Sequence, residues 1–128
     1  MRYVVLFSVL IGVLNIFFSW FFCSIDKCVI NNGIAFGISI KGEISITFLL
    51  ILFLLYIGWK VKKDWGVILG SVGILGFSNL ICRVVFGGVS DYLHIFSLSF
   101  NIADIFIVLF SIVSGVLILF KKDINNIR

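Results

Sequence analysis

The sequence predicts an all-α membrane protein with four transmembrane helices. Of its 128 residues, 62% are hydrophobic and only 12% are charged, and the mean hydropathy is +1.27. A soluble domain is about 45–50% apolar and about 25% charged, so this composition excludes a disordered chain, a nucleic-acid-binding tail and most water-soluble folds. The apolar residues also fall into separate runs, and a helix needs roughly 20 such residues to cross a bilayer.

The apolar runs define the expected helices in order. The first, residues 3–22, carries no charge, and the bulky residues before Cys23 do not fit the small-residue cleavage site of a signal peptide, so this run is expected to be retained as a helix. The second, 44–60, is short. The third, 65–82, contains glycines that let helices approach closely. The fourth, 102–120, is interrupted by Asp104. Without a linker or a proline, residues 1–128 are expected to form one four-helix membrane domain.

The basic residues predict the direction of the helices. Cytoplasmic loops of membrane proteins carry an excess of Lys and Arg. The seven that would share one side are Arg2, Lys60, Lys62, Lys63, Lys121, Lys122 and Arg128, and the three on the other side are Lys27, Lys41 and Arg83. Both termini are therefore expected in the cytoplasm, with the segments 23–43 and 83–101 facing outward. The net charge of +4 also suits contact with membrane lipids.

Polar residues gather on the outward side. They are Asn31, Asn32, Asn79, Arg83, Asp91, Asn101 and Asp104. Asp104 suggests a functional site because an ionisable group at membrane depth is costly, although it could instead cap the fourth helix. Asp91 could be an ordinary loop carboxylate. Two carboxylates that share a site resist joint ionisation, which leaves one acid and one base. Such a pair suits peptide hydrolysis, and it equally suits a proton relay or a cation site.

Three stretches of this outward side resemble the motifs of a known family. They are Asn31-Asn32-Gly33-Ile34-Ala35-Phe36-Gly37, then Ser78-Asn79-Leu80-Ile81-Cys82-Arg83 followed by Gly87, Val89, Ser90, Asp91 and Tyr92, and finally Phe100-Asn101-Ile102-Ala103-Asp104. In order, they are similar to the N-x-G-A-A-F, G-N-L-I-D-R-x-x-x-G-x-V-x-D-F and F-N-x-A-D patterns of signal peptidase II, the bacterial lipoprotein signal peptidase. The resemblance covers most of the chain.

The resemblance implies a four-helix aspartic peptidase with a small extracytoplasmic β segment. Such enzymes remove signal peptides from prolipoproteins just before a diacylglyceryl-modified cysteine. Asp91 and Asp104 would be the catalytic pair, and the residues that would line the site and hold the substrate are Asn31, Gly33, Asn79, Arg83 and Asn101. No metal or organic cofactor is implied.

The family also implies a cellular setting and partners. The expected location is the bacterial cytoplasmic membrane, with the active site on the extracytoplasmic side. The expected partners are lipid-modified prolipoproteins and membrane lipids, with no nucleic acid, and the protein is expected to be a monomer.

The chain departs from the family pattern at several positions. The family often has an Asp and a Lys four residues apart in its first helix, where this chain has Asn15 and Ser19, and Cys82 replaces the Asp before the motif arginine. A catalytically inactive homologue is therefore one alternative. A small transporter, with the two acids binding a cation or relaying protons, is another, although a transporter would place such charges near the bilayer midplane.

Three further residues are given no catalytic role. Cys23 and Cys28 fall in the outward segment, where they could form a disulfide or stay as free thiols. The only histidine, His94, is far from these cysteines in the sequence, and it is expected to be an interfacial loop residue and not a metal ligand or a base.

Overall fold

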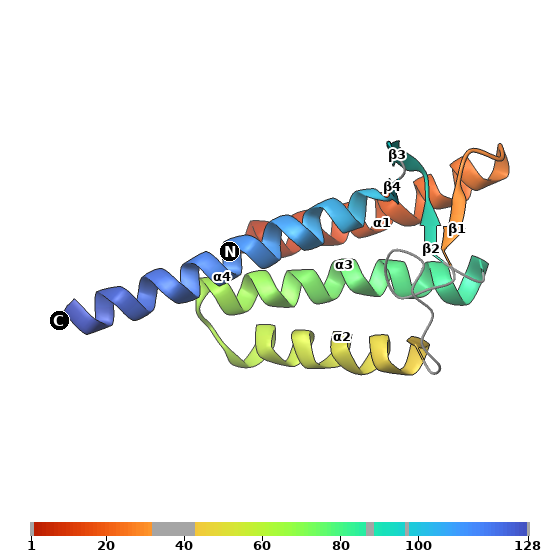
Figure 1. The fold of residues 1–128 in the computed structure, drawn as a ribbon. Helices are drawn as coiled ribbons and strands as arrows, with labels where there is room; N and C mark the ends of the chain where they lie inside the picture. Colours follow the sequence, from red (N-terminus) through yellow and green to blue (C-terminus); the bar gives the residue numbers. More distant parts are fainter. Residues whose placement is uncertain (1, 32–42, 87–88, 97, 128) are drawn as a thin grey trace.

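The computed structural model describes residues 2–31, 43–86, 89–96 and 98–127 of the chain. Its helices are α1 (Arg2–Ser24), α2 (Glu43–Lys60), α3 (Asp64–Phe86) and α4 (Ile102–Ile127). Successive helices run in opposite directions, so the end of α1 and the start of α4 lie at the same end of the bundle as the end of α3 (Figure 1). The predicted fold class, a mainly helical membrane protein with four helices, is confirmed.

The helices have the length and composition of membrane spans. Within the described residues, α1, α3 and the Ile102–Phe120 part of α4 are long and apolar enough to cross a bilayer, and the apolar helix Ile44–Lys60 is shorter. Large apolar side chains such as Leu49 and Phe53 of α2 are more than half exposed on the bundle surface. In a bilayer these faces meet lipid chains, which are the solvent that such a surface requires.

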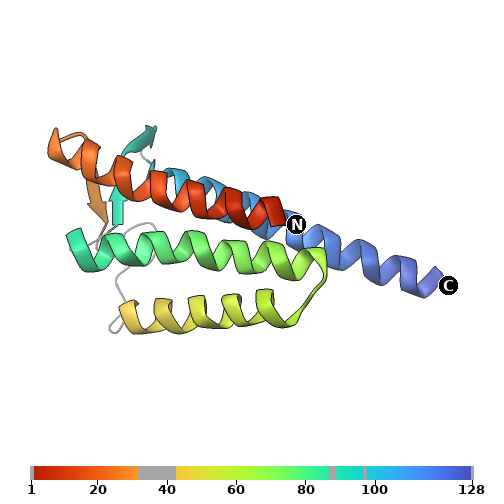
Figure 2. The same cartoon turned by 180° about the vertical axis from the view of Figure 1, so that it is seen from behind.

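Helix α3 is the central element of the bundle. It packs against α1, α2 and α4, and the view from behind also shows it between α2 and the other two helices (Figure 2). It approaches α2 closely where two glycines meet, since a Cβ added to Gly58 would lie 2.6 Å from the Cα of Gly70. On the α4 side, Ser114 Oγ donates a hydrogen bond to the carbonyl oxygen of Trp65 at 2.9 Å.

Two short antiparallel strand pairs lie at the end of the bundle where α4 begins (Figure 1). In the first, β1 (Val29–Asn31) pairs with β2 (Val89–Asp91), and Val29 is opposite Asp91. In the second, β3 (Leu93–Ile95) pairs with β4 (Leu98–Phe100). The strands fix the path of the chain on both sides of Asp91. The two acids are thereby attached to ordered elements and not to an open loop.

A disulfide joins Cys23 to Cys28, with the Cα atoms 5.0 Å apart. It closes the turn between α1 and β1, which is also held by a hydrogen bond from the Lys27 amide to the carbonyl oxygen of Phe22 at 2.8 Å. Of the two alternatives left open by the sequence, the structure forms the disulfide and not two free thiols.

Helices α3 and α4 end several residues beyond the apolar runs that predict them. Helix α3 ends at Phe86 and not near Cys82, so Arg83 lies in its last turn and not in the outward loop. The three residues after Arg83 are apolar and continue the helix, and a cation in the last turn is favourable to the helix dipole. Helix α4 continues to Ile127, past the expected end near residue 120.

Candidate active site

Asp91 and Asp104 come from different elements but contact the same residue, Asn101. Asp91 is the last residue of β2, and Asp104 lies in the first turn of α4. The side-chain amide nitrogen of Asn101, Nδ2, donates to Asp91 Oδ1 at 3.4 Å. The backbone amide of Asn101 donates to Asp104 Oδ2 at 3.1 Å. The two acids expected to form a pair are therefore brought to one site.

The start of α4 explains how Asp104 is positioned. Asn101 Oδ1 accepts a hydrogen bond from the Asp104 backbone amide at 3.1 Å, while Asp104 Oδ2 accepts one from the Asn101 backbone amide. This reciprocal arrangement is a capping box, which satisfies two backbone donors at the helix start. Asp104 therefore does contribute to the cap of α4, which was the alternative to a functional role. The cap uses Oδ2, while Oδ1 belongs to the hydrogen-bond network of the site.

Asn79 of α3 occupies the centre of the hydrogen-bond network. Its Nδ2 donates to Asp104 Oδ1 at 3.2 Å. Its Oδ1 accepts hydrogen bonds from Asn101 Nδ2 and from Asn15 Nδ2, each at 3.1 Å. Asn79 therefore connects the central helix α3 both to the acid on α4 and to the first helix α1.

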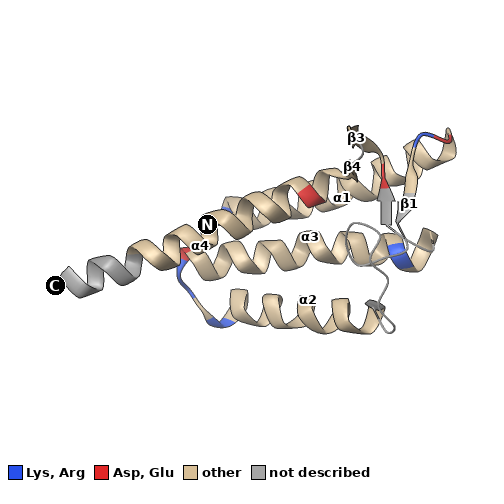
Figure 3. Cartoon of the chain, viewed as in Figure 1, with Lys and Arg blue, Asp and Glu red and all other residues tan. Residues whose placement is uncertain are grey.

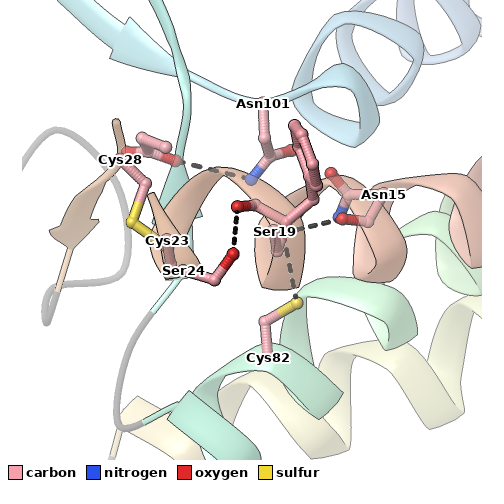
Figure 4. Close-up of a disulfide and its surroundings, with 9 residues drawn as sticks. Asn15, Ser19, Cys23, Ser24, Cys28, Cys82 and Asn101 are labelled. Atoms are coloured by element: carbon pink, nitrogen blue, oxygen red, sulfur yellow. Dashed lines mark hydrogen bonds between the residues drawn. A yellow bond between two sulfur atoms is a disulfide. The ribbon is translucent and has the colours of Figure 1, made fainter. Parts of the chain in front are cut away.

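The wall formed by α1 is polar but uncharged, and Figure 4 shows it facing Asn101. Asn15 Nδ2 also lies 3.3 Å from Ser78 Oγ, and Ser19 Oγ donates to the Asn15 carbonyl oxygen at 2.7 Å. Cys82 Sγ lies 3.7 Å from Ser19 Oγ (Figure 4). Asn15, Ser19 and Cys82 are all fully buried. These three residues, which all depart from the family pattern, thus form one neutral, hydrogen-bonded cluster that Asn79 connects to Asp104.

Tyr92 is a further site residue to which the sequence analysis gave no role. It is buried, and its hydroxyl donates to Asn15 Oδ1 at 2.8 Å and accepts a hydrogen bond from the Ile102 backbone amide at 3.2 Å. Burial raises the pKa of Tyr92 to about 12, so the hydroxyl keeps its proton at neutral pH. Two features of the sequence could have indicated this role. One is the polar Asn15 within an uncharged apolar run, and the other is a tyrosine at a position where the family pattern has phenylalanine.

The other expected site residues lie at the edge of this network or outside the described residues. Arg83 is buried on α3, four residues after Asn79, a spacing that places both on one face of the helix. The backbone of Asn31 belongs to β1, while its side chain and Gly33 fall outside the described residues. His94 is exposed, and its Nδ1 lies 3.0 Å from Ser99 Oγ. Among the described residues, no group of three or more His, Cys, Asp and Glu is placed to hold a metal ion.

The charged residues lie mainly at the two ends of the helices. Figure 3 shows basic residues at the α2–α3 connection and, at the opposite end of the bundle, an arginine of α3 together with charges in the turn after α1. Asp104 lies in the first turn of α4. The acid–amide network therefore sits toward one end of the bundle.

The apolar helices and the acid–amide network together define an integral membrane protein with an enzyme-like polar site. A solved structure described as "Bacterial membrane enzyme structure by the in meso method at 2.3 A resolution" is similar to it, with a TM-score of 0.77, over 98% of this chain and 92% of that one. Its sequence identity is 22%, so this likeness establishes the fold.

The family follows from a comparison with family models. The model described as Signal peptidase (SPase) II matches residues 4–121, and the chain therefore belongs to the signal peptidase II family. This membership makes the chain a peptidase of the lipoprotein signal peptidase type. No curated protein sequence gives a significant match.

Proposed function

We propose that this protein is an aspartic endopeptidase that removes signal peptides from diacylglyceryl-modified prolipoproteins, just before the lipidated cysteine. Family membership supports peptidase activity in general. The proposal adds the reaction mechanism, the cleavage position and the residues that act. One observation carries it: Asn101 donates hydrogen bonds to both Asp91 and Asp104.

The proposed chemistry uses one protonated and one ionised carboxylate. The ionised acid takes a proton from a water molecule, whose oxygen attacks the carbonyl carbon of the scissile peptide bond. The protonated acid donates a hydrogen bond to the carbonyl oxygen, and the acid that took the proton from water gives it to the amine nitrogen as the carbon–nitrogen bond breaks, which restores the starting pair. Two neighbouring carboxylates favour this state because they resist joint ionisation. No metal or organic cofactor enters these steps.

The amides around the pair suit supporting roles in this reaction. Asn79 and Asn101 hold the two carboxylates through the hydrogen bonds described above. We assign Asn31, Gly33 and Arg83 to binding of the substrate, because an arginine presents several donors in a fixed geometry to carbonyl or carboxylate oxygens.

The proposed setting is the bacterial cytoplasmic membrane, with the active site on the extracytoplasmic side and both termini in the cytoplasm. The lysines of the α2–α3 connection, at the end of the bundle away from Asp91, support this orientation. An apolar signal segment and two acyl chains would reach the site laterally through lipid, and water would enter from outside. Both acids come from one chain, which is consistent with a single membrane domain over 1–128 that acts as a monomer.

A cleavage assay tests this function. The purified protein in detergent is incubated with a diacylglyceryl-modified prolipoprotein, and the product is identified by mass spectrometry. We expect cleavage just before the lipidated cysteine, no cleavage of the unmodified precursor, and a loss of at least about a thousandfold in Asp91→Asn and in Asp104→Asn, because each removes the acid–base pair.

Asp64→Asn is the matched control, because Asp64 is an exposed acid at the start of α3, at the other end of that helix from Arg83. It should cleave at the wild-type rate. Two results contradict the proposal. One is a folded wild-type protein that leaves the lipidated substrate intact, which would favour the inactive-homologue alternative. The other is full activity in either acid variant.

A further inference from the structure

Two departures from the family pattern lie in direct contact. Tyr92 stands where the pattern has phenylalanine, and Asn15 stands where the first helix of the family often has an acid. The hydroxyl that distinguishes tyrosine from phenylalanine donates to Asn15 Oδ1 at 2.8 Å. The two positions are 77 residues apart in the sequence, so only the fold brings them together.

This hydrogen bond fixes which way the Asn15 amide faces. Because Oδ1 accepts from Tyr92, Nδ2 points to Asn79 and donates to its Oδ1 at 3.1 Å. The Asn79 amide is then oriented as well, and its Nδ2 donates to Asp104 Oδ1 at 3.2 Å. Each group therefore donates to the next, from the tyrosine hydroxyl through the two amides to the Asp104 carboxylate. An amide turned over at either asparagine would set two oxygens against each other.

The same hydroxyl also holds the first turn of α4. It accepts a hydrogen bond from the Ile102 backbone amide at 3.2 Å, and that amide has no partner within its own helix because it belongs to the first turn. The tyrosine ring is held against α1, stacked on Phe22 with the ring centroids 5.3 Å apart and edge-on to Phe18 at 6.1 Å. The ring alone would retain this packing if the hydroxyl were removed.

We propose that Tyr92 is a positioning residue for the acid pair, because its hydroxyl orients the Asn15 and Asn79 amides and thereby the hydrogen bond received by Asp104. The proposal rests on the proposed peptidase function. It assigns Tyr92 and Asn15 to one functional unit in which neither residue contacts the scissile bond.

The test is a double-mutant cycle in the cleavage assay with the lipidated prolipoprotein. It compares wild type, Tyr92→Phe, Asn15→Ala and the double variant, with kcat and KM measured separately. Tyr56→Phe is the matched control, since it removes a hydroxyl from an exposed tyrosine of α2. Thermal unfolding in the same detergent shows whether each variant is folded.

We expect Tyr92→Phe to lower kcat about tenfold with KM nearly unchanged, because one buried hydrogen bond of the network is lost while the ring remains. Asn15→Ala should lower kcat by at least as much. The double variant should match the slower single variant, because both changes interrupt the same chain of donors. Tyr56→Phe should behave as wild type.

Several results would overturn the proposal. They are a Tyr92→Phe enzyme as active as wild type, a double variant whose loss is the product of the two single losses, and a Tyr92→Phe protein that does not fold, which would make the hydroxyl structural. A folded wild type that cleaves nothing overturns the peptidase function and this proposal together. An active wild type with a fully active Tyr92→Phe overturns only the positioning role.

Discussion

Substitutions of Asn101 should separate its two roles at the start of α4. Its Oδ1 accepts the Asp104 backbone amide and caps the helix, while its Nδ2 donates to Asn79 and to Asp91. Asn101→Ser keeps an oxygen that can cap the helix but removes the amide donor. Asn101→Ala removes both groups. The difference between the two variants therefore reports the cap, and their shared loss reports the donor.

The expected sizes follow from these contacts. Loss of the bond to Asn79 costs about 1 kcal/mol and loss of the long bond to a carboxylate about 1.5 kcal/mol, which together lower kcat/KM about 70-fold in Asn101→Ser. Asn101→Ala should show at least the same kinetic loss. It should also be less stable than Asn101→Ser by about 1 kcal/mol, the usual contribution of an N-cap.

The assay combines cleavage kinetics on lipidated prolipoprotein with thermal unfolding in detergent. Ser99→Ala is the control. Ser99 lies two residues before Asn101, and its hydroxyl contacts the exposed His94 and not the acids. It should leave kcat/KM unchanged. The reasoning is refuted if Asn101→Ser keeps wild-type kcat/KM. It is also refuted if Asn101→Ala proves as stable as Asn101→Ser, since the capping contact would then contribute nothing.

Two further predictions concern stability and are checked by thermal unfolding in detergent. Gly58→Ala should destabilise the protein by about 1–3 kcal/mol, because its new methyl group would lie 2.6 Å from the Cα of Gly70 and α2 would have to move away from α3. Gly115→Ala is its control and should cost nothing, since no atom lies within 4 Å of the added Cβ, and equal stability of the two variants would contradict the packing argument. Cys28→Ser should cost about 2 kcal/mol, because opening a short disulfide loop frees the unfolded chain only modestly. A reducing agent should reproduce this loss of stability in the wild type and leave the Cys28→Ser variant unchanged. The prediction is contradicted if alkylation shows that the disulfide has been reduced and the wild type still unfolds at the same temperature.

The helices could be predicted because each is encoded locally, by an apolar run of membrane-spanning length. The end of α3 could not be predicted in the same way. Arg83 is charged, and a charge beside an apolar run indicates the membrane surface and a loop. In the structure this arginine is buried among the site elements, and the helix continues for three residues beyond it. Tertiary packing, which the local sequence does not reveal, buries Arg83 within the helix bundle.

The site residues also differ in whether their roles could be predicted from the sequence. Asp91, Asp104, Asn79 and Asn101 could be selected because they stand in motifs at short spacings. The role of Asn15 could not, because its partners Ser78 and Asn79 lie 63 and 64 residues away in the sequence. From the sequence alone, Asn15 indicated only the loss of a charged residue. Its hydrogen bonds show what replaces that charge.

The physical consequence of this replacement concerns the electrostatics of the site. A buried ion pair carries a large desolvation cost, and breaking it by the loss of one partner leaves an uncompensated charge. Asn15 and Ser19 avoid both costs, because an amide and a hydroxyl need only matched donors and acceptors. Neutral amides have a requirement that charges do not: each amide must present its nitrogen to an acceptor and its oxygen to a donor in order to support the acids. A hydroxyl at position 92, donating to Asn15, supplies that orientation. The polar residues of α1 and the tyrosine beside Asp91 therefore belong to one hydrogen-bond network. An acid introduced at position 15 alone should disturb that network, because a carboxylate cannot donate to Asn79.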